Sequence, residues 1–354
     1  AYSCSFVQRR GAPVWVSLLM AAAYGFMPIF SVMAISTCKD TLFSACLLVM
    51  LLKTWELIES PEKFFSNRKD LALYVVCGVG SALLRNNGLF AYALLLPSLM
   101  VVLRGHRRQA ALLLAVCLGA SGIVTGILTA ALSPEASPSF QLYSIPAQQL
   151  VRAYNSGRMS DEEKAEIEEW YTSPEGYYTV RPHLGDAAKG YLDRARIQTD
   201  GSGFMKLWSK DAKEYAHEYI EAFLMLNVGS WYPDDLSHST IYPDASYNDK
   251  GYLQLEEYDM ANVGIRTSCF LPVVRNLFER ICRRNYYQKY PIIAILFSTA
   301  TPFWLIVFAC AKLVCEKRGR FLPAALGILG IWLGYLFGPC TLPRYILPLY
   351  EYAG

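Results

Sequence analysis

Charged residues are scarce in this chain. They make up 18% of its 354 residues, whereas an average soluble domain carries about a quarter, and hydrophobic residues make up 53%. The formal net charge of +3 is too small and too unevenly distributed for the dense basic face of a nucleic-acid-binding protein. The composition therefore argues against a nucleic-acid partner and indicates a membrane protein.

The sequence lacks the motifs of common soluble enzymes. It has no glycine-rich phosphate loop, no nucleophile elbow and no internal repeat. The string HEYIE ends in Glu221 where a HExxH zinc site needs a second histidine. The ten cysteines form no CxxC pair, which argues against the usual metal and redox frameworks. The disulfide status of Cys269 and Cys282 stays open.

Long apolar runs, in contrast, are abundant. A transmembrane helix needs about 20 apolar residues, and seven runs approach or exceed that length. The predicted spans are residues 14–35, 41–58, 71–84, 89–103, 109–132, 291–311 and 321–337. The fold class that we expect is mainly α, a polytopic helical membrane protein. Its domains would be residues 1–132 with five spans, an inserted α-rich soluble domain over 133–290, and residues 291–354 with two spans and an exterior terminal segment.

The runs 71–84 and 89–103 could form two passes or one bent pass, and the distribution of basic residues favours two. The positive-inside rule counts Lys and Arg in the short loops beside the spans. With two passes, one side collects twelve: Arg9, Arg10, Lys63, Arg68, Lys69, Arg104, Arg107, Arg108, Lys312, Lys317, Arg318 and Arg320. The other side has three: Lys39, Arg85 and Arg344. The first side is predicted to be cytoplasmic and the second exterior.

The long region 133–290 holds 23 of the 30 acidic residues and is exterior by the same parity. The basic residues Arg280, Arg283, Arg284 and Lys289 argue against that side. Ser160 and Glu163 form a capping-box pattern at the start of a helix, and residues 206–225 are predicted to be helical. The acidic pairs at 234–235 and 256–257 are more typical of solvated turns than of a cation site.

Three short exterior loops each carry a basic residue, and each has a structural explanation beside a functional one. Lys39 and Asp40 in "STCKDTLF" suit a helix N-terminus, where the helix dipole favours Asp40. Arg85-Asn86-Asn87-Gly88 suits a tight turn in which Asn and Gly supply unusual backbone angles. Arg344 follows a helix break and could extend to lipid headgroups. Alternatively, the three loops converge and hold a phosphate.

Four blocks of sequence carry a resemblance to a known group of proteins. The blocks are "STCKDTLFSACLLVMLLK", "LLRNNGLFAYALLLP", "YSIPAQQLVRAY" and "FGPCTLPRYILPLY". Together they resemble a family of uncharacterised bacterial multi-pass proteins related to the GT-C glycosyltransferases. The resemblance implies an integral enzyme of the bacterial plasma membrane that takes a sugar from a polyprenyl-phosphate donor and passes it to an exterior glycan or lipid acceptor, with membrane lipids around it.

The resemblance also implies roles for particular residues. Residues expected to bind the substrate or the carrier phosphate are Lys39, Arg85, Asn86, Asn87, Gln148, Gln149, Arg344 and Tyr345. Asp40 is expected first to organise the phosphate site and second to serve as the catalytic base, and a divalent cation such as Mg²⁺ or Mn²⁺ is the implied cofactor. The chain looks like a segment of a longer protein, so the true base could precede Ala1.

Two rival functions stay open. A lipid-linked saccharide transporter or flippase would also bind phosphate, but it would be expected to carry ionisable residues along its spans. Apart from Lys53 and Glu56 near one end, the predicted spans carry none. A non-catalytic assembly or sensor subunit with an exterior ligand domain is the third possibility.

Overall fold

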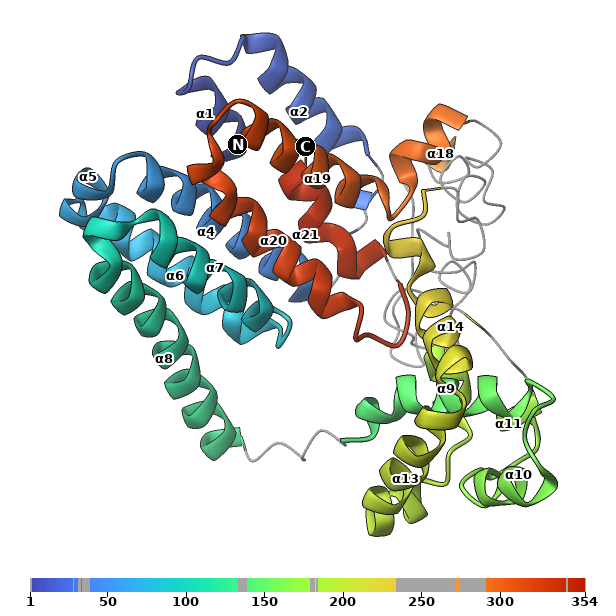
Figure 1. Ribbon diagram of the computed structural model, residues 1–354. Coiled ribbons are helices and arrows are strands. Elements are labelled where there is room, and N and C mark those ends of the chain that lie inside the picture. Colours follow the sequence, from blue (N-terminus) through green and yellow to red (C-terminus); the bar gives the residue numbers. More distant parts are fainter. Residues whose placement is uncertain are drawn as a thin grey trace. The chain divides into compact units, whose positions relative to one another are not determined.

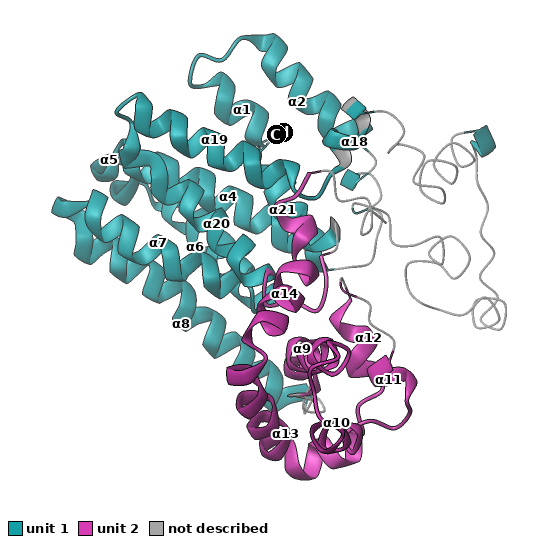
Figure 2. Ribbon diagram, turned by 45° about the vertical axis from the view of Figure 1, so that its right-hand side comes forward, with its two compact units in different colours: residues 1–133, 239–335, 342–354 teal, residues 134–238, 336–341 magenta. Residues whose placement is uncertain are grey.

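The structure is a computed structural model of residues 1–354, and the part that it describes is helical. It describes residues 2–27, 29–30, 33, 39–132, 139–178, 182, 184–233, 271–273, 291–341 and 343–353. These residues contain no β-strand, only one isolated bridge between Tyr171 and Leu192. The chain divides into two compact units (Figure 2): unit 1 is 1–133, 239–335 and 342–354, and unit 2 is 134–238 with 336–341. The acidic pairs at 234–235 and 256–257, Cys269, Cys282 and the basic residues of 280–289 lie outside the described residues.

Unit 1 is a bundle of apolar helices (Figure 1). Its elements are α1 (Tyr2–Gln8), α2 (Val14–Phe26), α4 (Lys39–Glu59), α5 (Pro61–Ser66), α6 (Arg68–Leu84), α7 (Gly88–Val102), η1 (Arg104–His106), α8 (Arg107–Leu132), α18 (Pro291–Phe297), α19 (Thr301–Cys315), η5 (Gly319–Phe321), α20 (Leu322–Tyr335) and α21 (Pro343–Ala353). Helix α4 is central, because it packs against α6, α20 and α21. Large apolar side chains of α4 are fully buried in these contacts, including those of Phe43, Leu47 and Met50.

Helices α6 and α7 form a hairpin, as expected for two separate segments. The hydroxyl of Tyr92 on α7 donates to the carbonyl of Gly78 on α6 at 2.7 Å, so the two helices run back along each other. Helix α7 in turn packs closely on α20. A Cβ on Gly330 would lie 2.3 Å from the Phe90 carbonyl oxygen, so only glycine permits this approach of the two backbones.

Several of the segments that connect the helices gather at one end of unit 1. The ring of Phe65 on α5 stacks with His106 of η1, with centroids 6.0 Å apart. The ring of Trp55 near the end of α4 stacks with Phe321 of η5 at 4.2 Å. These contacts bring together three connections that carry most of the basic residues counted from the sequence.

Two helices are both long and apolar enough to cross a bilayer, among the residues described here: Lys39–Glu59 and Arg104–Leu132. Shorter apolar helices are Val14–Phe26, Gly88–Val102, Thr301–Cys315 and Gly319–Tyr335. Two predicted helices were wrong in length. The run 14–35 is not one helix, because α2 ends at Phe26 and its C-cap Met27 is extended, as the residue before a proline tends to be. The run 291–311 divides into α18 and α19, with Pro302 in the first turn of α19.

Unit 2 is built around α9 (Ser144–Tyr154), which packs against the helices on either side of it. The other elements are η2 (Ser139–Tyr143), α10 (Asp161–Glu168), α11 (Glu175–Tyr178), α12 (Gly185–Gly190), α13 (Arg194–Glu214), α14 (Ala216–Leu226) and η3 (Val228–Ser230). The predicted capping box is confirmed: Ser160 Oγ accepts from the Glu163 amide, and Glu163 accepts from the Ser160 amide. The prediction that residues 206–225 are helical is confirmed, since α13 and α14 cover them and meet at Tyr215.

Candidate functional site

Asp40 and Arg85 meet at one end of unit 1. Asp40 lies in the first turn of α4, where the helix dipole favours its charge, and it is 5% exposed. Arg85 follows the last residue of α6, at the turn into α7. Its Nη1 atom lies 3.1 Å from Asp40 Oδ1. This ion pair joins Asp40 to the RNNG turn, although Asp40 and Arg85 are 45 residues apart in the sequence.

Tyr345, at the start of α21, brings a second guanidinium to the same place. The guanidinium carbon of Arg85 lies 4.6 Å from the centroid of the Tyr345 ring, and that of Arg344 lies 4.9 Å from it. Arg344 Nη2 also donates to the Tyr345 hydroxyl at 3.0 Å. The two cations are therefore closer than a Debye length, about 10 Å at ordinary salt, and the ring attracts both.

Tyr335 completes this group, and sequence analysis missed it. It is the last residue of α20, is 6% exposed, and its ring lies 6.3 Å from the Tyr345 ring at a small angle. The Arg85 guanidinium carbon lies 6.0 Å from it. Tyr335 was hidden inside the predicted span 321–337; a tyrosine at the exit of an apolar run was the available signal. We call Asp40, Arg85, Tyr335, Arg344 and Tyr345 the Arg85 cluster.

The other residues expected in the first two loops differ from one another. Lys39 is exposed, directly beside Asp40, and makes no ion pair within the described residues. Asn86 is exposed and Asn87 half-buried. Their carbonyl oxygens accept from the amides of Leu89 and Phe90, both at 3.1 Å, and so begin α7. The asparagines shape the turn that presents Arg85.

Gln148 and Gln149 belong to the core of unit 2, on helix α9. Gln149 is 8% exposed; it donates to the Tyr219 carbonyl at 3.1 Å and accepts from the Trp208 indole at 2.9 Å. Gln148 is 4% exposed and donates to the Pro182 carbonyl. Because these amide groups are engaged in the packing of unit 2, we leave both residues out of the candidate site.

The implied divalent cation does not fit the residues at hand. Within the described ranges, no three His, Cys, Asp or Glu side chains gather in a way that could hold a metal ion. At the Arg85 cluster the carboxylate of Asp40 faces a guanidinium, which competes with a metal for the same oxygen. We therefore derive no chemical step from a metal.

The charges of the Arg85 cluster suit an anion. Two guanidiniums and the neighbouring Lys39 ammonium outweigh the one carboxylate of Asp40. The buried Nη1 of Arg85 makes no aligned hydrogen bond within the described residues, although it lies near Asp40. The planar fork of a guanidinium is well suited to the oxygens of a phosphate.

These features define a class: a helical protein in which distant helix ends assemble a cationic cluster able to accept an anion. The chain belongs to the DUF6020 family, a family of unknown function that matches residues 1–352. No curated protein and no solved structure matches it.

Proposed function

We propose that this chain is part of a GT-C-like membrane glycosyltransferase that moves a sugar from a polyprenyl-phosphate carrier to an acceptor on the exterior face of the bacterial plasma membrane. In this proposal the helices of unit 1 cross the bilayer up to seven times, and the acceptor is a glycan or lipid of the cell envelope. The donor binds with its phosphate at the Arg85 cluster.

The surface of unit 1 supports contact with lipid. Helix α8 exposes apolar side chains along its length, including Leu112 at 65%, Ile123 at 66% and Leu132 at 71%. Helices α2 and α19 do the same, with Trp15 at 64% and Phe308 at 65% exposed. In water such continuous apolar faces would promote aggregation, whereas hydrocarbon solvates them without cost.

The Arg85 cluster is the observation that carries the proposal. In the proposed reaction the acceptor hydroxyl oxygen forms a bond to the anomeric carbon, and the bond from that carbon to the carrier phosphate oxygen breaks. The hydroxyl proton ends on the departing phosphate, which leaves as a monoester monoanion. Arg85, Arg344 and Lys39 would neutralise the charge that grows on the phosphate. Asp40 would hold Arg85 in place through their ion pair.

A transfer assay tests this function. Purified protein is incubated with a polyprenyl-phosphate sugar labelled in the sugar, and transfer to acceptor is measured. Removing one such charged donor from a phosphate site costs about a hundredfold or more in rate. We expect that loss for Arg344→Ala and Arg85→Ala, and wild-type turnover for Arg108→Ala, an exposed arginine on α8. Unchanged turnover in Arg344→Ala and Arg85→Ala would exclude the cluster from the reaction.

One observation favours the transporter as a second candidate. Glu351 lies on α21, which packs against α4, α19 and α20, and its Oε2 is buried without a hydrogen-bond partner in the described part of the chain. Ionisable groups within a helical membrane bundle commonly mark a transport path. Movement of the labelled lipid across vesicles without transfer of its sugar would support this candidate; an assembly or sensor subunit would show neither activity.

A further inference from the structure

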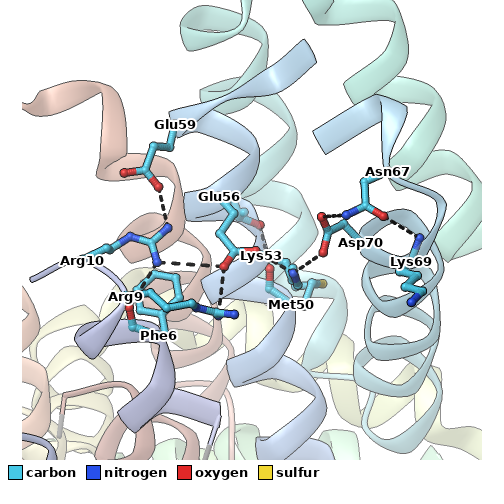
Figure 3. A network of polar contacts seen from close by, with 11 residues as sticks. Phe6, Arg9, Arg10, Met50, Lys53, Glu56, Glu59, Asn67, Lys69 and Asp70 are labelled. Carbon is cyan, nitrogen blue, oxygen red and sulfur yellow. Dashed lines mark hydrogen bonds and ion pairs between the residues drawn. The ribbon is translucent and has the colours of Figure 1, made fainter. Parts of the chain in front are cut away.

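A second polar site lies at the opposite end of α4 from Asp40, where the connecting segments of unit 1 meet (Figure 3). A cavity of about 680 Å³ opens there. Its walls come from the α1–α2 connection, the last turns of α4, α5, the start of α6, and Arg318 before η5. We call it the Lys53 pocket, after the buried lysine at its base.

The Lys53 pocket contains more positive than negative side chains. Five basic residues line it: Arg9, Arg10, Lys53, Lys63 and Arg318. Three carboxylates line it: Glu56, Glu59 and Asp70. The excess of two positive charges means that an anion entering the cavity is attracted overall.

The carboxylates are already bound by cations inside the network. Lys53 is 5% exposed, and its ammonium lies 2.6 Å from Glu56 Oε2 and 2.5 Å from Asp70 Oδ1 (Figure 3). Arg10 Nη2 lies 2.5 Å from Glu59 Oε2. The carboxylates therefore hold Lys53 and Arg10 in position and are not available to bind a cationic ligand.

Over the described ranges, two of the basic residues that line the pocket make weak ion pairs with carboxylates or none. Lys63 on α5 makes no ion pair within the described residues. Among the residues that the structure describes, Arg318 pairs with Glu316 alone, at 3.9 Å, and its guanidinium lies near the Trp55 and Phe321 rings. These two cations sit at the same cavity as the neutralised network, so they are the ones with donors to offer a ligand.

We propose that the Lys53 pocket binds a phosphate group, held by Lys63 and Arg318. The cavity is large enough for a phosphate ester with a headgroup attached, rather than for a bare ion alone. The phosphate could belong to an anionic phospholipid headgroup or to a water-soluble phosphate ester, and both offer the same oxygens to the same cations. This site is separate from the Arg85 cluster and does not depend on the sugar transfer proposed above.

The test compares Lys63→Gln with Lys312→Gln. Lys63 lines the pocket and is exposed, whereas Lys312 on α19 is also exposed, with its side chain 75% exposed, and does not line it. The full-length protein in detergent is titrated with inorganic pyrophosphate, and separately placed in phosphatidylcholine vesicles with and without phosphatidylglycerol. Lipid retained by the protein is counted by native mass spectrometry, and the melting temperature without ligand confirms folding of each variant.

We expect Lys63→Gln to lose affinity for one of the two probes by about tenfold, the worth of one charge-assisted hydrogen bond, while Lys312→Gln binds like the wild type. Loss for phosphatidylglycerol alone identifies a lipid headgroup, and loss for pyrophosphate identifies a soluble ester. Equal losses in Lys63→Gln and Lys312→Gln, or no loss in Lys63→Gln, would overturn the proposal.

Discussion

Gly88 is required by space rather than by backbone angle. The sequence suggested that Asn and Gly supply unusual angles to the RNNG turn, but that expectation was wrong: Gly88 is not among the glycines with positive φ, which are Gly11 and Gly157 in the described chain. Instead, a Cβ on Gly88 would lie 1.9 Å from the backbone oxygen of Ser81. Backbone cannot move aside as a flexible side chain can, so the contact fixes the turn that presents Arg85.

Gly88→Ala is therefore expected to destabilise unit 1 by about 1–3 kcal/mol, as overpacking does. Thermal unfolding of the detergent-solubilised protein measures this. Gly122→Ala on α8 is the matched control, because nothing lies within 4 Å of its added Cβ and alanine is the better helix former. Equal unfolding temperatures for the two variants would contradict the requirement for glycine at position 88.

Asp211 gives unit 2 a pH dependence. It lies on α13, is 3% exposed, and its Oδ2 has no hydrogen-bond partner within the described residues. Its pKa is raised from 3.8 to about 6, chiefly by burial; the Lys210 ammonium lowers the pKa, and the charges of Glu163 and Glu166 raise it. The folded chain then binds this proton more tightly than the unfolded chain, so the stability that the protonated carboxyl provides is present below about pH 4 and lost as the pH rises to about 6.

Asp211→Asn keeps the shape and removes the charge. We expect it to raise the stability of unit 2 at pH 7 by about 1–2 kcal/mol and to leave stability at pH 3 unchanged. Melting temperatures at the two pH values provide the measurement. Glu162→Gln, an exposed carboxyl on α10, should change neither; an Asp211→Asn variant that is no more stable at pH 7 would contradict the assignment.

The members of the Arg85 cluster were only partly predictable. Charge parity among short loops predicts that Lys39, Arg85 and Arg344 lie at one end of the helices. The ion pair of Arg85 with Asp40, beside Lys39, and the tyrosine ring shared by Arg85 and Arg344 agree with that grouping. Gln148 and Gln149 show the limit, since a buried amide and a ligand-binding amide have the same sequence. Only the partners in three dimensions distinguish them.

Helices were easier to predict than their ends. An apolar run specifies that a helix exists, and α4, α6, α7 and α8 all lie where such runs predicted. The errors at α2 and α19 occur beside Pro28 and Pro302, where a hydrophobic pattern continues through a residue that interrupts helical geometry. A hydrophobicity pattern does not reveal this interruption, because it counts proline as one more uncharged residue.

The capping box of α10 supports a direct test of one predicted helix start. Ser160→Ala removes the acceptor of the Glu163 amide and should lower the stability of unit 2 by about 1 kcal/mol. Ser209→Ala on α13 is the control, because in the described part of the chain that hydroxyl donates only to the Lys206 carbonyl, within its own helix. Chemical denaturation followed by tryptophan fluorescence reports both; a loss in Ser209→Ala equal to that in Ser160→Ala would contradict a capping role.

The two ends of unit 1 carry different polar groups, and each end is the site of one of the two proposals. One end carries the Arg85 cluster, with two guanidiniums at one tyrosine ring, and the other carries the Lys53 pocket with its network of carboxylates and cations. Helix α4 reaches from one to the other, from Lys39 to Glu59. At 1.5 Å per residue a helix of this length is about 30 Å long, the thickness of a hydrocarbon core.

The central claim is that these two ends face opposite sides of a membrane, with the Arg85 cluster outside. Single cysteines replace Lys39 and Asn86 at one end and Lys63 and Lys312 at the other, all four exposed. Intact cells are treated with an impermeant maleimide, and mass spectrometry locates the label against the parent chain. The account predicts labelling at 39 and 86 in intact cells, and at 63 and 312 only after permeabilisation. Labelling of 39 and 63 from the same side would contradict it.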